Sequence, residues 1–95
     1  MKPIDDFLTH MTVERGVSSN SYDAYRRDLT GYLAHLKRRK TSPARAAARD
    51  VQSFVVSLRK RGLAPSSISR HLSAVRMFQR FLVSEGLAAS DPTEH

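Results

Sequence analysis

Histidine, serine and arginine residues give this 95-residue sequence imidazole, hydroxyl and guanidinium groups that can do chemistry. The four histidines have no carboxylate partner at metal-ligand spacing, and the sequence contains neither an HExxH motif nor a cysteine. No GxSxG motif marks a serine nucleophile, and no glycine-rich loop offers a cradle for phosphate. These patterns predict no catalytic centre, no metal or cofactor, and no small-molecule ligand.

Arginine and lysine in the middle of the chain predict contact with a polyanion instead. The net charge is +7, but residues 15–80 alone contain 15 Lys and Arg against three Asp, a balance of +12. The flanks are acidic, with balances of −2 over residues 1–14 and −3 over residues 81–95. A basic block of this density favours nucleic acid as the partner over a surface that only keeps a small protein in solution.

The elements that must position these residues are helices, because apolar residues recur at spacings of three and four and no strand-like alternation is long enough. We expect helices over about 3–14 and 19–38, a third that starts after Pro43 and closes at Gly62, and a fourth from 65 to about 86. The fold class is therefore all-α, a compact four-helix domain. No run approaches a membrane span and acidic residues occupy the N-terminus, so we expect a cytoplasmic protein that contacts no membrane.

The faces opposite the apolar stripes of the second and fourth helices carry small residues and arginines. At 100° per residue these outward positions are Asn20, Ala24, Arg27 and Gly31 on the second helix, and Ser66, Arg70, Ser73 and Met77 on the fourth. Small residues leave room for a close neighbour, and arginine supplies reach. Such a face suits a helix that docks against a nucleic-acid groove.

Several side chains have two interpretations at this stage. Asn20, Ser21, Ser66 and Ser67 are expected first as helix caps and second as phosphate ligands. Tyr22, Tyr25 and Tyr32 lie on a helical stripe, which favours core residues with a polar tip over nucleophiles.

Four further residues also have more than one interpretation. Arg26 and Arg27 are expected to pair weakly with Asp23 or Asp28. Arg76 is as well suited to an ion pair with Asp28 or Asp50 as to a DNA contact. Phe81 lies off the main stripe, where it either extends the core or packs on another domain.

Two long stretches resemble tyrosine recombinases of the Xer and phage-integrase type. FLTHMTVERGVSSNSYDAYRRDLTGYLAHL is similar to the opening of these proteins, with a leading helix that ends in ERG(L/V)S and then xNTxxxYxxDLxxF. DVQSFVVSLRKRGLAPSSISRHLSAVRMFQRFLVSEGLAASDP resembles their pattern DIxxFLxxLxxxGLSxxSIxRxLSxLRxFxxFLxxEGLxxxNP. Together the matches cover about residues 4–92, and only the alanine- and arginine-rich segment 41–49 is less diagnostic.

The resemblance implies a four-helix core-binding domain, also called SAM-like, that forms half of a clamp around double-stranded DNA. In the family a second domain carries the arginine-rich active site and the nucleophilic tyrosine, so the chain is expected to contribute no catalytic residue. Residues 1–90 would be the core-binding domain, and residues 91–95 the start of the interdomain linker. The parent protein would assemble with other recombinase protomers as a tetramer on DNA.

By the same resemblance the second and fourth helices approach the major groove. Matched position by position, the DNA-binding residues are Asn20, Ser21, Ala24, Arg27, Ser66, Ser67, Arg70 and His71. Arg70 is expected to point fully outward and to read a base edge, whereas His71 lies at the margin of the stripe and is mostly structural. The alternative is a basic helical interaction module for an acidic protein partner or for the assembly of recombinase protomers.

Overall fold

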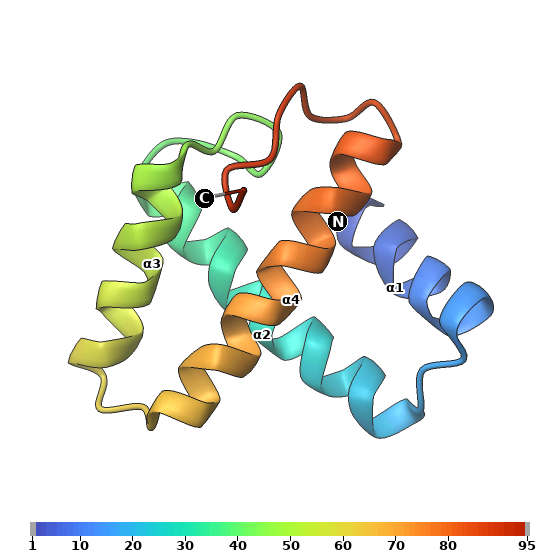
Figure 1. Cartoon of the computed structure of the whole chain (residues 1–95), viewed down its shortest axis with the longest axis horizontal. Coiled ribbons are helices and arrows are strands. Elements are labelled where there is room, and N and C mark those ends of the chain that lie inside the picture. Colours follow the sequence, from blue (N-terminus) through green and yellow to red (C-terminus); the bar gives the residue numbers. More distant parts are fainter. Residues whose placement is uncertain (1, 95) are drawn as a thin grey trace.

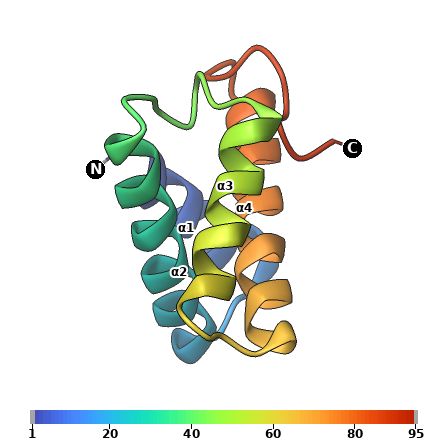
Figure 2. The same cartoon turned by 90° about the vertical axis from the view of Figure 1, so that its left-hand side faces the viewer.

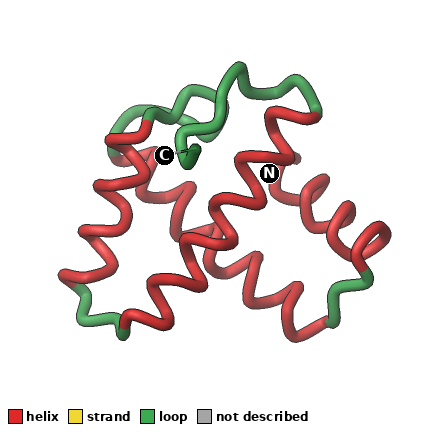
Figure 3. Tube along the Cα trace, viewed as in Figure 1, coloured by secondary structure: helices red, strands yellow, loops and turns green. Residues whose placement is uncertain are grey.

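Helices α1 (Lys2–Arg15), α2 (Ser19–Arg38), α3 (Ala48–Lys60) and α4 (Pro65–Ser84) account for most of the chain, joined by short loops (Figure 3). The computed structural model describes residues 2–94, and side chains from residue 4 onward. No strand occurs within residues 2–94. The predicted all-α four-helix fold and the approximate bounds of its helices are confirmed.

The turns at the helix ends follow from local sequence. Gly16 ends the first helix with a φ of +62° and Gly62 follows the third with a φ of +79°, conformations that a residue with a side chain adopts only under strain. Ser18 caps α2, because its hydroxyl accepts a hydrogen bond from the Ser21 backbone N–H at 3.3 Å. Asn20 and Ser21 were expected as caps, but both lie inside the first turn.

The core is a single cluster to which every helix contributes. Phe7 of α1 makes edge-on ring contacts with Phe78 and Phe81 of α4, at centroid distances of 5.4 and 5.6 Å. Tyr32 of α2 makes a similar contact with Phe54 of α3 at 5.3 Å. Of the two interpretations of Phe81, the structure supports the first, since the ring is 9% exposed and extends the core.

Helices α2 and α4 cross each other at the centre of the molecule (Figure 1). Helix α1 lies on one side of the crossing and α3 on the other. The N-terminal ends of α2 and α4 both lie at the lower edge in Figure 1 and remain at that edge after the quarter turn of Figure 2. The two outward faces that the sequence singled out therefore begin at the same edge of the domain, although at opposite corners of it (Figure 1).

A polar network fixes α3 against the C-terminal end of α2, at the opposite edge. Arg39 donates through Nε to Asp50 Oδ1 at 2.7 Å and through Nη1 to the Ser53 hydroxyl at 3.2 Å. The Ala47 backbone N–H donates to Asp50 Oδ2 at 2.8 Å. This hydrogen bond, with help from Arg39, lowers the pKa of the Asp50 carboxyl. Burial, reinforced by nearby arginines, lowers the pKa of His35, whose Nε2 lies 3.0 Å from the Ser53 oxygen.

The C-terminal segment folds back beside the loop that connects α2 and α3 (Figure 1). Pro92 is buried there, and Asp91 accepts a hydrogen bond from the Thr93 backbone N–H at 2.8 Å. His95 lies outside the described residues. The domain boundary at residue 90 and the linker over residues 91–95 remain predictions.

Candidate nucleic-acid interface

A depression of about 340 Å³ opens between α2, the end of α3 and the start of α4. Three arginines from three elements line it: Arg27 of α2, Arg61 directly after α3, and Arg70 of α4. Ser67 and His71 of α4 also line it, and Asp28 is its acidic member. We call this depression the arginine basin. It brings together four of the eight predicted DNA-binding residues.

Arg70 does not point fully outward, which corrects the expectation from helical geometry. Its Nε donates to Asp28 Oδ2 at 3.0 Å and its Nη2 donates to Asp28 Oδ1 at 3.2 Å. The Arg70 side chain is nevertheless 52% exposed, whereas that of Asp28 is 2% exposed. Arg70 therefore stands at the surface of the basin with one edge of its guanidinium tied to a buried carboxylate.

His71 is largely a structural residue, as its place at the margin of the stripe predicted. Its side chain is 12% exposed, and its Nε2 lies 3.3 Å from Asp28 Oδ1. Its Nδ1 lies 2.7 Å from the Ser67 carbonyl oxygen, one turn earlier in α4. The ring therefore bridges α4 to the carboxylate of α2, and contributes to the wall of the basin rather than to its exposed surface.

The remaining predicted residues lie at the N-terminal ends of the same two helices but outside the basin. Asn20, Ser21 and Ser66 are exposed, and Ala24 is half-buried. Ser66 and Ser67 are not the caps of α4, because Ala64 occupies the cap position and makes no side-chain bond there. Pro65 has no N–H and the Ser67 N–H donates to the Ala64 carbonyl oxygen, so the groups that suit an anion at this end are the two hydroxyls and the Ser66 N–H.

Arg26 bonds to other residues of the domain, whereas Arg27 lines the basin, as their different positions around the helix predict. The partner of Arg26 nevertheless differs from the prediction. Arg26 Nη2 donates to Asp5 of α1 at 2.8 Å and to the Tyr22 hydroxyl at 3.1 Å, rather than pairing with Asp23 or Asp28. The hydrogen bond from Arg26 lowers the pKa of the Asp5 carboxyl. Arg27 is exposed and lines the basin, which leaves it suited to a contact outside the chain.

Arg61 is the basin residue that sequence reasoning missed. It lies in the RKRG run that ends α3 and was counted only toward the overall charge. Its backbone N–H bonds to the Ser57 carbonyl oxygen, which fixes the residue at the helix end, and the chain then turns at Gly62 into α4. One feature of the sequence could have identified Arg61: it lies in the loop directly before α4, a helix that was expected to face a groove.

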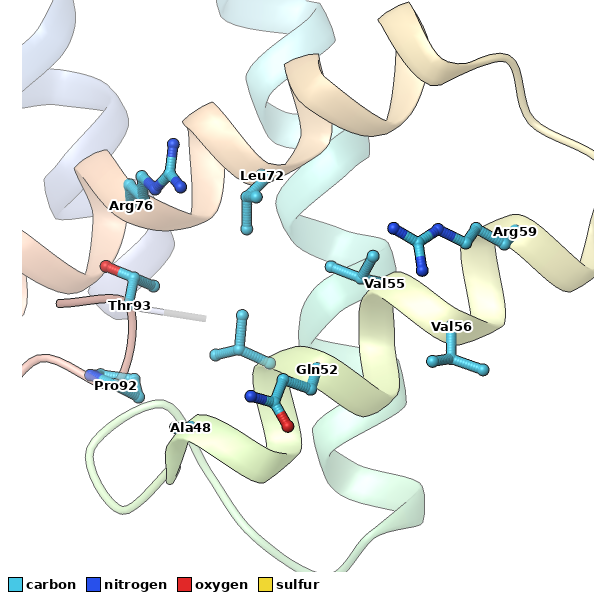
Figure 4. Close-up of a pocket in the computed structure, with 10 residues that line it drawn as sticks. Ala48, Gln52, Val55, Val56, Arg59, Leu72, Arg76, Pro92 and Thr93 are labelled. Atoms are coloured by element: carbon cyan, nitrogen blue, oxygen red, sulfur yellow. The ribbon is translucent and has the colours of Figure 1, made fainter. Parts of the chain in front are cut away.

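A second depression, of about 280 Å³, lies between α3 and α4 and is mostly apolar. Figure 4 shows Arg76 of α4 and Arg59 of α3 on either side of Val55 and Leu72, with Pro92 and Thr93 at one end. Arg76 makes no ion pair among the described residues, since Asp28 pairs with Arg70 and His71 and Asp50 pairs with Arg39. Met77, expected to face outward, is half-buried against the core.

Neither a metal-binding cluster nor a membrane-spanning helix occurs in the part of the chain that the structure describes. Within residues 2–94, no three His, Asp or Glu side chains gather closely enough to hold a metal ion. Over the same residues, none of the helices has the length and apolar content needed to cross a membrane.

Comparison with known proteins connects this geometry to a family. The phage integrase, N-terminal SAM-like domain matches residues 4–86. Tyrosine recombinase XerD of Oceanobacillus iheyensis is 38% identical over 94 residues, which cover 97% of this chain and 32% of the relative. XerD of Chlorobaculum tepidum is 40% identical over 94 residues, which cover 99% of this chain and 31% of the relative. The chain thus spans about a third of the length of these relatives, and no solved structure matches it.

Proposed function

The chain belongs to the N-terminal SAM-like domain family of phage integrases, and we propose that it binds double-stranded DNA as the core-binding part of a tyrosine recombinase. The observation that carries the proposal is the convergence of Arg27, Arg61 and Arg70 on one basin between α2, the end of α3 and the start of α4. Three guanidinium groups beside the N-terminal end of α4 make a surface complementary to a sugar-phosphate backbone, and the N-terminal end of α2 lies along the same edge of the domain (Figure 1).

Phosphate contacts supply most of the affinity in this proposal, and base contacts supply the discrimination. Each phosphate neutralised releases counterions, so the logarithm of the binding constant falls with the logarithm of salt concentration by about 0.9 per contact. Arg70 is the residue we assign to a base edge, because an arginine held at a groove can donate two hydrogen bonds to guanine. The remaining contacts with DNA we assign to residues near the N-terminal ends of α2 and α4, namely Asn20, Ser21, Ala24, Ser66 and Ser67.

The strand breakage and rejoining of a recombinase we assign to the remainder of the longer protein. Support comes from the share of the XerD relatives that the chain covers, about a third of their length. In the proposal, residues 91–95 lead toward that second part, and the two parts close around the duplex as a clamp. Because tethered halves share the binding energy, the chain on its own binds DNA more weakly than the complete clamp. Assembly with other protomers on DNA belongs to the same proposal.

Titration of the chain into a short, fluorescently labelled, mixed-sequence DNA duplex at low and at physiological salt tests the proposal. We expect binding at low salt that weakens steeply as salt is raised. Poly-glutamate serves as the competitor that separates DNA binding from a module for an acidic protein. An absence of binding at low salt, or displacement of the duplex by poly-glutamate at equal charge concentration, contradicts the proposal.

A further inference from the structure

Asp28 is a buried carboxylate whose two oxygens both face α4. The residue is 3% exposed, although it lies on the face of α2 that borders the arginine basin. Oδ2 accepts from Arg70 Nε, while Oδ1 accepts from Arg70 Nη2 and lies 3.3 Å from His71 Nε2. A carboxylate in this position needs cationic partners, because a buried charge without them is strongly destabilising.

Stability alone does not explain why the main partner is a half-exposed arginine. A guanidinium has five N–H donors in a planar fork, and Asp28 engages one on Nε and one on Nη2. The free donors lie at the end of the group, on Nη1 and on the second N–H of Nη2. A bidentate bond along one edge fixes the plane of the group and therefore the direction in which these free donors point.

The geometry assigns Asp28 as a positioning residue for DNA recognition, which holds the Arg70 guanidinium so that its free end faces the bound duplex. This inference rests on the proposed function and names a residue within the same site. The bond to Asp28 also limits which donors of Arg70 can contact DNA. The edge formed by Nε and Nη2 is occupied by Asp28, so Arg70 contacts a phosphate or a guanine end-on, through Nη1 and Nη2. A long side chain held in one orientation before binding loses less conformational entropy when the duplex arrives.

Replacement of Asp28 by asparagine separates the effect of positioning from the effect of charge, because the two change the affinity for DNA in opposite directions. Asp28→Asn removes a negative charge next to the basin, and by long-range electrostatics this change alone tightens DNA binding. Loss of a fixed Arg70 weakens binding instead, by roughly three- to ten-fold for one immobilised side chain. Asp23→Asn is the matched control, since Asp23 lies exposed on the same helix and its replacement makes the same change in charge.

The experiment measures binding of the full chain to the short mixed-sequence duplex at low salt, together with the urea midpoint of each variant. We expect Asp23→Asn to bind slightly more tightly than the unsubstituted chain, and Asp28→Asn to bind roughly three- to ten-fold more weakly than the Asp23→Asn control. In a chain that already carries Arg70→Gln, we expect Asp28→Asn to cause no further weakening. Arg70→Lys keeps both the charge and a partner for Asp28 but lacks the fork, and we expect it to weaken binding to a similar degree.

Two binding results overturn the inference while leaving the proposed function intact. One is a folded Asp28→Asn variant that binds as tightly as the Asp23→Asn control. The other, decisive if Asp28→Asn fails to fold, is an Arg70→Lys variant that binds like the unsubstituted chain. A chain that does not bind the duplex at all contradicts the proposed function itself. A measurement without DNA completes the test. The Arg70 Nε–H proton should exchange with water more slowly than the Arg27 Nε–H proton, because it is bonded to Asp28. Equal exchange rates of the two protons contradict the inference.

Discussion

The Tyr32 hydroxyl of α2 donates a 2.9 Å hydrogen bond to Gln79 Oε1 of α4, and both side chains are fully buried. Gln79 Nε2 in turn donates to the Pro43 carbonyl oxygen at 3.1 Å, so that the two crossing helices and the loop between α2 and α3 share one buried polar chain. Burial raises the pKa of the Tyr32 phenol, which keeps it neutral and able to donate. These two buried hydrogen bonds set the relative position of α2 and α4, the helices that carry the basin.

We predict that Tyr32→Phe destabilises the domain by about 1–3 kcal/mol, because Gln79 Oε1 is left buried without a donor. Urea denaturation followed by circular dichroism measures the change in the free energy of unfolding. Tyr25→Phe is the control, since the Tyr25 hydroxyl makes no hydrogen bond among the described residues and the ring is only half-buried. Equal stability of the two variants would show that the buried bond contributes nothing measurable.

Arg61 is predicted to contact DNA although its position in the sequence did not suggest it. Arg61→Ala should reduce the slope of log binding constant against log salt by about 0.9, the value for one phosphate contact. Arg45→Ala makes the same change in charge in the exposed loop between α2 and α3, at the opposite edge of the domain, and should leave the slope nearly unchanged. Identical slopes for the two variants would argue that only overall charge matters.

Gly31 is a helical glycine that packing within the domain does not require. A methyl group added there would meet no atom within 4 Å, yet glycine in a helix interior is about 0.8–1.0 kcal/mol less favourable than alanine. Because Gly31 lines the basin, we attribute its absence of a side chain to the approach of DNA. Gly31→Ala should therefore raise the urea midpoint and weaken duplex binding. A variant that is stabilised and binds equally well would show that the duplex does not come close to α2 at this point.

Stability should fall on mild acidification because of His35. Its pKa is lowered in the folded domain, so the unfolded chain binds the proton more readily. The contribution of His35 is complete above its ordinary pKa of about 6.5 and is lost as the pH falls from there through the lowered value. Asp50, whose pKa is also lowered, adds a further loss below its ordinary value of about 3.8.

The unfolding free energy measured between pH 7.5 and pH 5, a range chosen around the ordinary histidine value of about 6.5, tests this prediction. His35→Gln should flatten the dependence. A dependence on pH that His35→Gln does not alter would place its origin elsewhere in the molecule.

The sequence located the helices well because each one buries an apolar stripe of regular period, as Ile4, Phe7, Leu8 and Met11 do in α1. The exposure of Asn20 and Arg27 was also predicted correctly, because it depends only on their positions around one helix. Pairings between helices were not foreseen. Asp28 and Arg70 are 42 residues apart, and Asp5 and Arg26 are 21 apart, so their contacts depend on how the helices cross, which periodicity does not specify.

Nuclear magnetic resonance of the labelled chain during titration with the duplex tests the location of the interface most directly. We predict that amide signals shift first over the part of α2 from Ser19 to Gly31 and over residues 61–71, which include Arg61 and the start of α4. Signals of the loop between α2 and α3, at the opposite edge, should change little. Shifts concentrated in that loop or on α1, with residues 61–71 unaffected, would contradict the assignment of the arginine basin as the DNA-binding surface.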